Sequence, residues 1–120
     1  MREEMMTEIL NELSSSSGDI EAAALVSTDG LMMASVLPTS LDEDRVGAMI
    51  AAMLTLGDRT AQELSRGSLE QVMVKGDAGY VLMTHAGTDS VLAVLAKASA
   101  KLGLVFLDAK RAAESLGKVV

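Results

Sequence analysis

The first apolar positions of the chain recur with the period of a helix. In residues 2–13 they fall on one stripe of an amphipathic helix, at Met5, Met6, Ile9, Leu10 and Leu13. The serine run at 14–17 and Gly18 predict the end of this helix, because a polar run closed by glycine commonly caps a helix and begins a loop. We interpret the serines as a loop and cap, and assign them no other function.

Two short apolar runs follow, at residues 21–27 and 31–36, and both are typical of β-strands. Asp29 and Gly30 lie between them, and Asp-Gly is a strong hairpin signal because glycine accepts the positive φ of a tight turn. The pattern predicts a hairpin in which Asp29 is a turn residue rather than a ligand.

The longest periodic segment runs from about Asp42 to Arg66. Ser40 and Glu43 have the S-x-x-E spacing of a capping box, so we expect the helix to begin there. Acidic residues gather at its positive end, Arg66 lies at its negative end, and Gly67 supplies a stop signal. These signals give the middle helix the best-marked boundaries in the chain.

Three apolar runs and one periodic segment complete the chain. Strands are predicted near residues 69–75, 79–85 and 90–96, and their short glycine-containing connections indicate antiparallel hairpins. A last helix is predicted over about residues 100–116. The order α-β-β-α-β-β-β-α packs most simply as one α/β (α+β) domain over residues 1–120, with an antiparallel five-stranded sheet and helices on both faces.

The middle helix has more apolar surface than one contact with a sheet requires. In a helical projection, one broad arc faces the sheet: Val46, Met49, Ile50, Met53, Leu54, Gly57, Ala61 and Leu64. The far side of the first three turns is also uncharged, at Gly47, Ala48, Ala51, Ala52 and Thr55. A helix that is apolar all round is normally buried on more than one side, so we expect a second contact.

A second stripe of this helix has the a/d rhythm of paired helices. It contains Arg45, Met49, Ala52, Leu56, Arg59 and Glu63. Two copies that cross antiparallel about Leu54 would place Ala52 opposite Leu56. Arg45 would then face Glu63 with opposite charge, so we interpret the stripe as a self-complementary seam. A rival stripe of the same rhythm contains Gly47, Ala51, Leu54, Asp58, Ala61 and Ser65. A third interpretation is a single buried helix whose alanine side simply tolerates solvent.

The strand after this helix is a candidate edge of the sheet. At an edge it could pair with its own copy in a two-fold dimer, which satisfies backbone groups that otherwise invite aggregation. The expected dimer interface therefore adds Leu69, Gln71, Met73 and Lys75 to the helical seam.

Composition narrows the class of protein. The chain has 120 residues and no Cys, which excludes disulfides, a thiol nucleophile and cysteine-based metal centres. Apolar residues make up 49% of the chain, enough for a core, yet no apolar run reaches the roughly 18 residues of a membrane span. The N-terminus lacks the pattern of a signal peptide, so we expect a cytoplasmic protein without membrane insertion.

The distribution of charge argues against a nucleic-acid partner. Ten acidic residues and one basic residue give residues 1–44 a charge of −9, whereas seven acidic and nine basic residues give residues 45–120 a charge of +2. The net charge of −7 repels phosphate, and one Tyr, one Phe and no Trp leave no platform on which bases could stack. We therefore expect no nucleic acid among the partners.

The residues supply no catalytic constellation. His85 is the one imidazole, near Thr84, Thr88 and Asp89, and a histidine at a strand end most often has a structural role. The sequence has no cluster of histidines with metal-ligand spacing and no glycine-rich phosphate loop before a helix. We expect no cofactor or metal. A small enzyme or ligand-binding domain centred on His85 is the alternative from another class.

The order of several segments resembles the roadblock/dynein light chain family, in particular its small stand-alone prokaryotic members. The segments are 22–35, 45–67, 69–76, 80–83 and 102–107, which together span about residues 20–117. Their specific elements are LVS-x-DGL, LGDRTAQEL and LEQVMVKG at these separations. The resemblance implies a roadblock/profilin-like three-layer sandwich that dimerises through the middle helix and third strand into a ten-stranded sheet.

The resemblance also implies a function. Members of the family serve as non-enzymatic platforms for small Ras-like GTPases, either to stimulate them or as scaffolds. The GTPase would bind the helix-bearing face of the dimer, where Ala48, Ala51 and Thr55 are the candidate contacts. A heterodimer with a related roadblock chain is the alternative, and the family offers no catalytic residue to assign.

Overall fold

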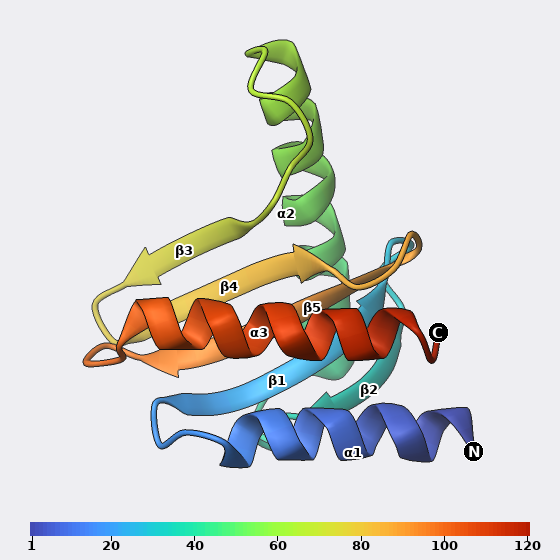
Figure 1. Ribbon diagram of the computed structural model, residues 1–120, viewed down its shortest axis with the longest axis vertical. Coiled ribbons are helices and arrows are strands. Elements are labelled where there is room, and N and C mark those ends of the chain that lie inside the picture. Colours follow the sequence, from blue (N-terminus) through green and yellow to red (C-terminus); the bar gives the residue numbers. More distant parts are fainter.

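One antiparallel sheet separates two layers of helices in the computed structural model, which describes residues 1–120 (Figure 1). The elements in chain order are α1 (Arg2–Ser15), β1 (Ile20–Ser27), β2 (Met32–Val36), α2 (Glu43–Glu63), β3 (Val72–Gly76), β4 (Gly79–His85), β5 (Ser90–Lys97) and α3 (Leu102–Gly117). The predicted order of elements and the α+β class are confirmed.

The strands are arranged in the order β2-β1-β5-β4-β3, and all neighbours are antiparallel. The central strands β1 and β5 are almost entirely buried, because the layers of helices cover both of their faces. Strand β3 lies at one edge of the sheet and β2 at the other. The prediction that the third strand is an edge is therefore confirmed.

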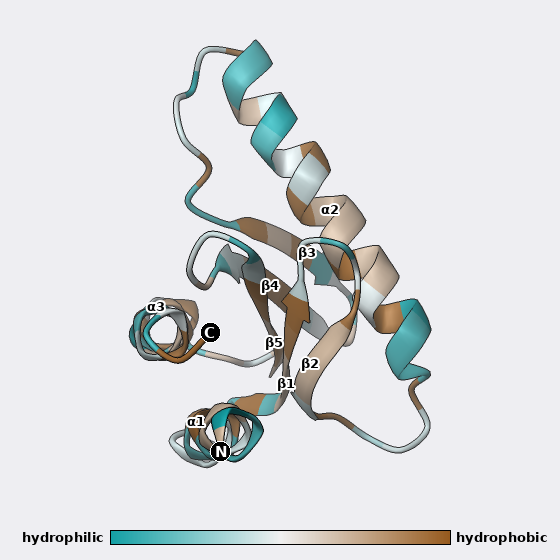
Figure 2. Cartoon of the chain, turned by 90° about the vertical axis from the view of Figure 1, so that its right-hand side faces the viewer, coloured by the Kyte–Doolittle hydropathy of each residue, from teal (hydrophilic) through white to brown (hydrophobic).

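Helices α1 and α3 lie side by side on one face of the sheet, and α2 crosses the other face (Figure 2). The larger core lies under α1 and α3, and its fully buried side chains include Leu10, Leu25, Leu92, Val105 and Leu116. The smaller core lies under α2 and contains Val26, Ile50, Leu54, Met83 and Val91. Only part of α2 is thus held by core packing.

The start of α2 differs from the prediction. Asp42 is the N-cap residue, and its carboxylate accepts hydrogen bonds from two backbone N–H groups of the first turn, at 3.0 and 3.3 Å. The predicted capping box of Ser40 and Glu43 is wrong, because the Glu43 carboxylate instead accepts a hydrogen bond from the Ser35 hydroxyl. Aspartate is as good an N-cap as serine, and it stands directly before the helix.

The end of α2 comes at Glu63, earlier than predicted. Ser65 has a left-handed backbone with a φ of 57°, and the backbone N–H of Arg66 donates to the Ala61 carbonyl at 2.7 Å. This is a Schellman motif, in which a left-handed residue terminates the helix. Ser65 therefore takes the role that we predicted for Gly67.

Two other boundaries also differ. Strand β3 begins at Val72, three residues after the predicted start at Leu69, because Leu69 first packs against α2. Leu69 and Gln71 thus lie outside the strand in which we expected them. Helix α1 extends to Ser15, whose hydroxyl donates to the Asn11 carbonyl at 2.8 Å, so half of the serine run is helical.

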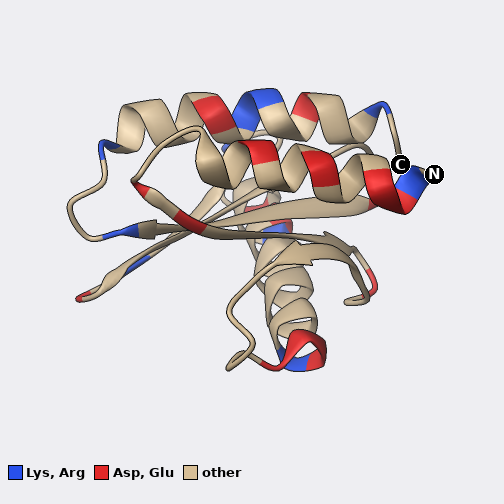
Figure 3. Cartoon of the chain, turned by 90° about the horizontal axis from the view of Figure 1, so that it is seen from below, with Lys and Arg blue, Asp and Glu red and all other residues tan.

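Charge and hydropathy are distributed unevenly over the helices. Acidic residues recur along α1 (Figure 3). None of the three helices combines the length and the apolar character that a membrane span requires.

Candidate functional site

Helix α2 crosses the sheet at two glycines. A Cβ at Gly47 would lie 2.6 Å from the carbonyl oxygen of Gly30, in the β1–β2 turn. A Cβ at Gly57 would lie 2.6 Å from Val72 Cγ2, at the start of β3. No side chain fits at these distances, so glycine allows the helix backbone to approach the sheet closely at both points. The two contacts determine which side of α2 faces the sheet.

Beyond Gly57, α2 continues past the edge of the sheet. Its last turns extend away from β3, with no strand beneath them (Figures 1 and 2). Leu56 is 60% exposed and Leu64 is 64% exposed, so this part of the helix presents large apolar side chains to solvent. We expected Leu64, Met49 and Met53 in the arc that faces the sheet, but all three are exposed, and that expectation is wrong.

The orientation of α2 has a steric cause. Close approach to the β1–β2 turn selects the small residues Gly47 and Ala51 for the buried side and leaves no room there for the longer methionines. Gly47, Ala51 and Leu54 also belong to the rival stripe considered above. Since all three are buried within the protomer, that stripe is not available for self-association.

The predicted seam lies on the free side of α2. Its six residues are all exposed: Arg45, Met49, Ala52, Leu56, Arg59 and Glu63. Within the helix, Arg59 and Glu63 form an ion pair at 3.7 Å, and at such an exposed position the pair contributes little to stability. No other element of the protomer covers the seam, and its use as an interface remains a prediction.

Strand β3 supplies a second exposed feature at the same edge. Its side chains alternate, so Val72 and Val74 face the α2 layer, whereas Met73 and Lys75 face the layer of α1 and α3. The outer backbone of β3 has no neighbouring strand. An unpaired strand and an exposed apolar helix side therefore lie next to each other.

A cavity of about 450 Å³ lies between the β1–β2 turn and the exposed side of α2. Its lining consists of Thr28, Asp29, Gly30, Ala48, Ala51, Ala52, Thr55, Leu56 and Arg59. Two candidate partner contacts, Ala48 and Thr55, are exposed here. The third, Ala51, is only 7% exposed because it packs beside Gly30, so it is not the surface contact that we expected. Asp29 is an exposed turn residue, as predicted.

His85 pairs with a residue that the sequence did not suggest. Its Nε2 lies 3.1 Å from Asp58 Oδ1 of α2, and both side chains are about one-third exposed. Thr84 projects from the opposite face of β4 and donates its hydroxyl to the Glu70 carbonyl. No hydroxyl forms a hydrogen bond with the His85 ring, so the pair has no nucleophile beside it. The contact joins residues on two different elements, and local sequence patterns carry no signal for it.

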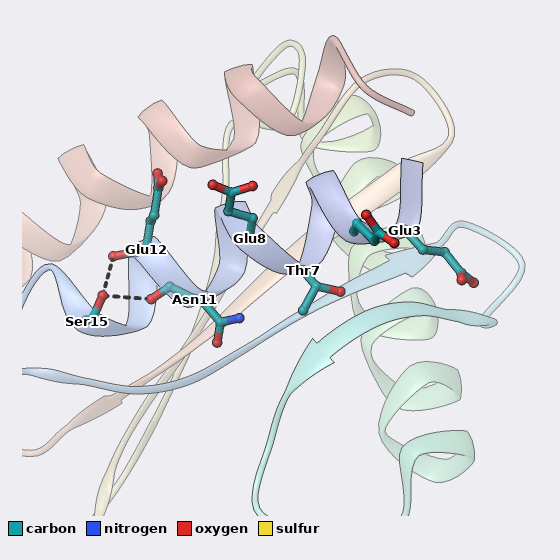
Figure 4. A pocket seen from close by; sticks show the side chains of 7 residues that line it. Glu3, Thr7, Glu8, Asn11, Glu12 and Ser15 are labelled. Atoms are coloured by element: carbon teal, nitrogen blue, oxygen red, sulfur yellow. Dashed lines mark hydrogen bonds between the residues drawn. The ribbon is translucent and has the colours of Figure 1, made fainter. Parts of the chain in front are cut away.

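The acidic side chains of α1 form a ridge rather than a site. A shallow surface cavity of about 660 Å³ is lined by seven residues of this one helix, among them Glu8 and Glu12, and none of the seven is apolar (Figure 4). The structure also brings together no group of three or more His, Asp or Glu residues that could hold a metal ion. We assign this surface no ligand.

Solved structures share this three-layer arrangement. Gliding protein MglB of Thermus thermophilus superposes with a TM-score of 0.87 at 23% identity, over 98% of this chain and 90% of that chain. Profilin II of Acanthamoeba castellanii superposes with a TM-score of 0.65 at 13% identity, over 94% and 97% of the two chains. The fold is thus a roadblock/profilin-like sandwich.

The sequence places the chain within this fold class. The Roadblock/LC7 domain family matches residues 6–96, and the chain belongs to this family. It is 43% identical over 112 residues to the uncharacterized protein MJ1340 of Methanocaldococcus jannaschii, with 93% of this chain and 96% of that protein covered. The predicted family is therefore confirmed.

Proposed function

We propose that this chain is a non-enzymatic regulator or adaptor that dimerises with itself and presents a platform to a small Ras-like GTPase. One observation carries the proposal: an exposed apolar helix side and an unpaired strand lie at the same edge of the sheet. Helix α2 overhangs β3 there, with Leu56 and Leu64 in solvent. Contiguous exposed apolar surface of this kind marks protein interfaces.

A two-fold axis beside β3 would cover the exposed side of α2 and pair the free edge of β3. Two β3 strands would pair antiparallel and join two five-stranded sheets into one of ten strands, which removes the unpaired edge. The overhanging turns of each α2 would cover the sheet of the other protomer and lie antiparallel to its α2. The contact uses the same surface on both chains, as a two-fold dimer requires.

The crossing point of α2 suggests the centre of this seam. Because α2 crosses β3 at Gly57, an axis beside β3 passes close to Leu56 rather than Leu54, where the sequence alone placed it. The shift brings Leu64 of one protomer near Met49 of the partner subunit. Both side chains are exposed in the protomer and would become buried together.

The GTPase platform is proposed on the α2 face of the dimer. Ala48 and Thr55 are exposed there, and the exposed turn residue Asp29 lines the same cavity. Small uncharged side chains provide a surface on which a folded partner can pack, and the carboxylate of Asp29 provides a charged contact that orients it. Membership in the Roadblock/LC7 family and likeness of fold to MglB support a regulatory role.

The test is isothermal titration calorimetry with the Ras-like GTPases of the source organism, each loaded with GDP or a non-hydrolysable GTP analogue. We expect one of them to bind more tightly in one nucleotide state. Ala48→Glu should weaken that binding at least 10-fold and leave the mass of the dimer unchanged. Thr88→Glu, in the β4–β5 turn, is the matched control and should bind as the wild type does.

The proposal has two parts, the dimer and the GTPase platform, and different results contradict each part. If none of the GTPases binds the dimer, the platform is wrong, but the proposed dimer still stands. A chain that is strictly monomeric alone, and that dimerises only with a related roadblock chain, favours the heterodimeric scaffold.

A further inference from the structure

Four glycines lie within the helices, and close contacts within the protomer explain why three of these positions are glycine. A Cβ at Gly47 or Gly57 would fall 2.6 Å from its nearest neighbour, and a Cβ at Gly117 would fall 3.1 Å from the backbone nitrogen of Gly87. Gly103, in the first turn of α3, is different, because a Cβ there would meet nothing within 4 Å. Glycine is unfavourable in a helix relative to alanine. Because no contact within the protomer requires glycine at position 103, we look for a contact with another molecule.

Gly103 forms part of one wall of a groove between α3 and the β3 edge of the sheet. The groove has a volume of about 430 Å³, and its lining includes Leu82, Thr84, Gly103, Phe106, Leu107 and Lys110. Met73 extends the apolar floor, because it pairs with Leu82 across β3 and β4 and projects from the same face. Met73 is 44% exposed and Leu107 is 43% exposed, so the groove presents uncovered apolar surface.

Two lysines stand beside this groove in a chain whose net charge is −7. Lys110 lines the groove and forms no ion pair. Lys75 projects from the same face of β3 as Met73, with its ammonium group over the ring of Tyr80. Glu70 is the one carboxylate in the lining and precedes β3, whereas the lining residues that come from α3 include Lys110 and no carboxylate. The α3 wall therefore favours an occupant with negative charge.

We propose that this groove binds an amphipathic helix of another protein, with apolar side chains on Leu107 and Met73 and an acidic side chain at Lys110. Gly103 allows the backbone of the incoming helix to approach α3 more closely than a larger residue would. The stretch from Gly103 to Lys110 is about 10 Å long, or two helical turns. The occupant therefore needs two apolar anchors about one turn apart.

A second copy of this chain suits the groove less well than a separate helix does. The exposed apolar side of α2 is already used by the proposed dimer, and the residues that line the surface cavity of α1 include no apolar anchor. Helix α3 also exposes Leu104 and Leu107, but Leu107 is itself part of the groove wall, so it already belongs to the site that the occupant would cover. We therefore assign the groove to a different protein.

The groove borders the β3 edge that the proposed dimer would pair, and Met73 belongs to the interface that we expected there, but the helical seam and the platform lie on the other face of the sheet. The groove lies on the face of the sheet opposite α2 and is complete within one protomer. A protein with both surfaces would connect a partner on the α2 face to a second partner on the α3 face. That arrangement suits an adaptor.

A phage library of helix-forming peptides, selected on the wild-type protein, supplies the probe. We expect the selected peptides to share two apolar residues spaced three or four apart and a neighbouring Asp or Glu. Fluorescence anisotropy then measures their affinity for two variants: Gly103→Trp fills the groove, and Lys110→Glu reverses its charge. Each should weaken binding at least 10-fold. The controls are Gly18→Trp, where a Cβ also meets nothing within 4 Å, and Lys118→Glu, beyond the end of α3, and both should stay within twofold of wild type.

Each remaining outcome counts against the groove. The proposal is overturned if no peptide is enriched over an unrelated protein, if the selected peptides are basic or lack helical spacing, or if Gly103→Trp binds as the wild type does. If Gly103→Trp lowers the mass of the protein in solution, the occupant is a second copy and the proposal is wrong. Peptide affinity should be unchanged in Leu56→Arg, which separates this inference from the dimer.

Discussion

Gly57 of α2 packs against Val72 of β3 with no room for a side chain between them, since a Cβ at position 57 would fall 2.6 Å from Val72 Cγ2. This contact fixes the point at which α2 crosses the edge strand. It therefore determines how much of the helix extends beyond the sheet. The exposure of Leu56 and Leu64 follows from the same geometry.

Gly57→Ala should lower the free energy of unfolding by about 1–2 kcal/mol, because overpacking against Val72 outweighs the gain in helix propensity. Urea denaturation in a Leu56→Arg background measures this change without a contribution from association. Gly103→Ala is the matched control, and it should raise the free energy of unfolding by up to about 1 kcal/mol. Equal stabilities of the two alanine variants would contradict the contact.

Asp42→Ala should lower the free energy of unfolding by about 1 kcal/mol, because it removes the carboxylate that accepts hydrogen bonds from the first turn of α2. Ser40→Ala is the control and should change stability by less than about 0.5 kcal/mol, since Ser40 is not the cap. Thermal and urea denaturation measure both variants. A larger loss for Ser40→Ala than for Asp42→Ala would restore the capping box that the sequence predicted.

The pair of His85 and Asp58 should show a coupling energy of about 0.2–1 kcal/mol, as expected for a partly exposed contact. A double-mutant cycle with His85→Ala and Asp58→Ala measures it through unfolding free energies. Dimer mass and GTPase binding should remain nearly unchanged in His85→Ala. Loss of a catalytic activity in this variant would instead revive the enzyme alternative.

The sequence predicts the fold well because its signals are local. Periodicity, turn glycines and short connections place all eight elements in the right order, and the edge position of β3 is also correct. The orientation of α2 was predicted less well. Hydropathy ranks Met49 above Gly47 as a core residue, whereas close approach to the backbone of Gly30 admits only the glycine.

In the candidate site too, features encoded by a local pattern could be predicted, whereas features that depend on packing between elements could not. The exposed seam on α2 could be found from the spacing of residues such as Leu56, because a repeat along one helix is visible in the sequence. Ala51 was placed on the partner face, yet it is buried against a turn some twenty residues earlier in the chain. The contact of Asp58 with His85 also depends on packing between separate elements, and no local pattern encodes it.

Leu56→Arg should raise the dissociation constant of the dimer by roughly 100-fold, because it places two guanidinium groups at the centre of an apolar seam. Leu56 is exposed in the protomer, so the far-ultraviolet circular dichroism spectrum should not change. Sedimentation velocity across a dilution series measures the constant, with Thr88→Glu as the control. A dimer of unchanged affinity would place the interface away from α2.

The solution mass of the wild-type chain, determined by light scattering across micromolar concentrations, tests whether the protein is a homodimer. We expect a mass near twice 12.5 kDa, because the α2 side and the β3 edge are both uncovered in the protomer. A mass of 12.5 kDa at every concentration would contradict the homodimer.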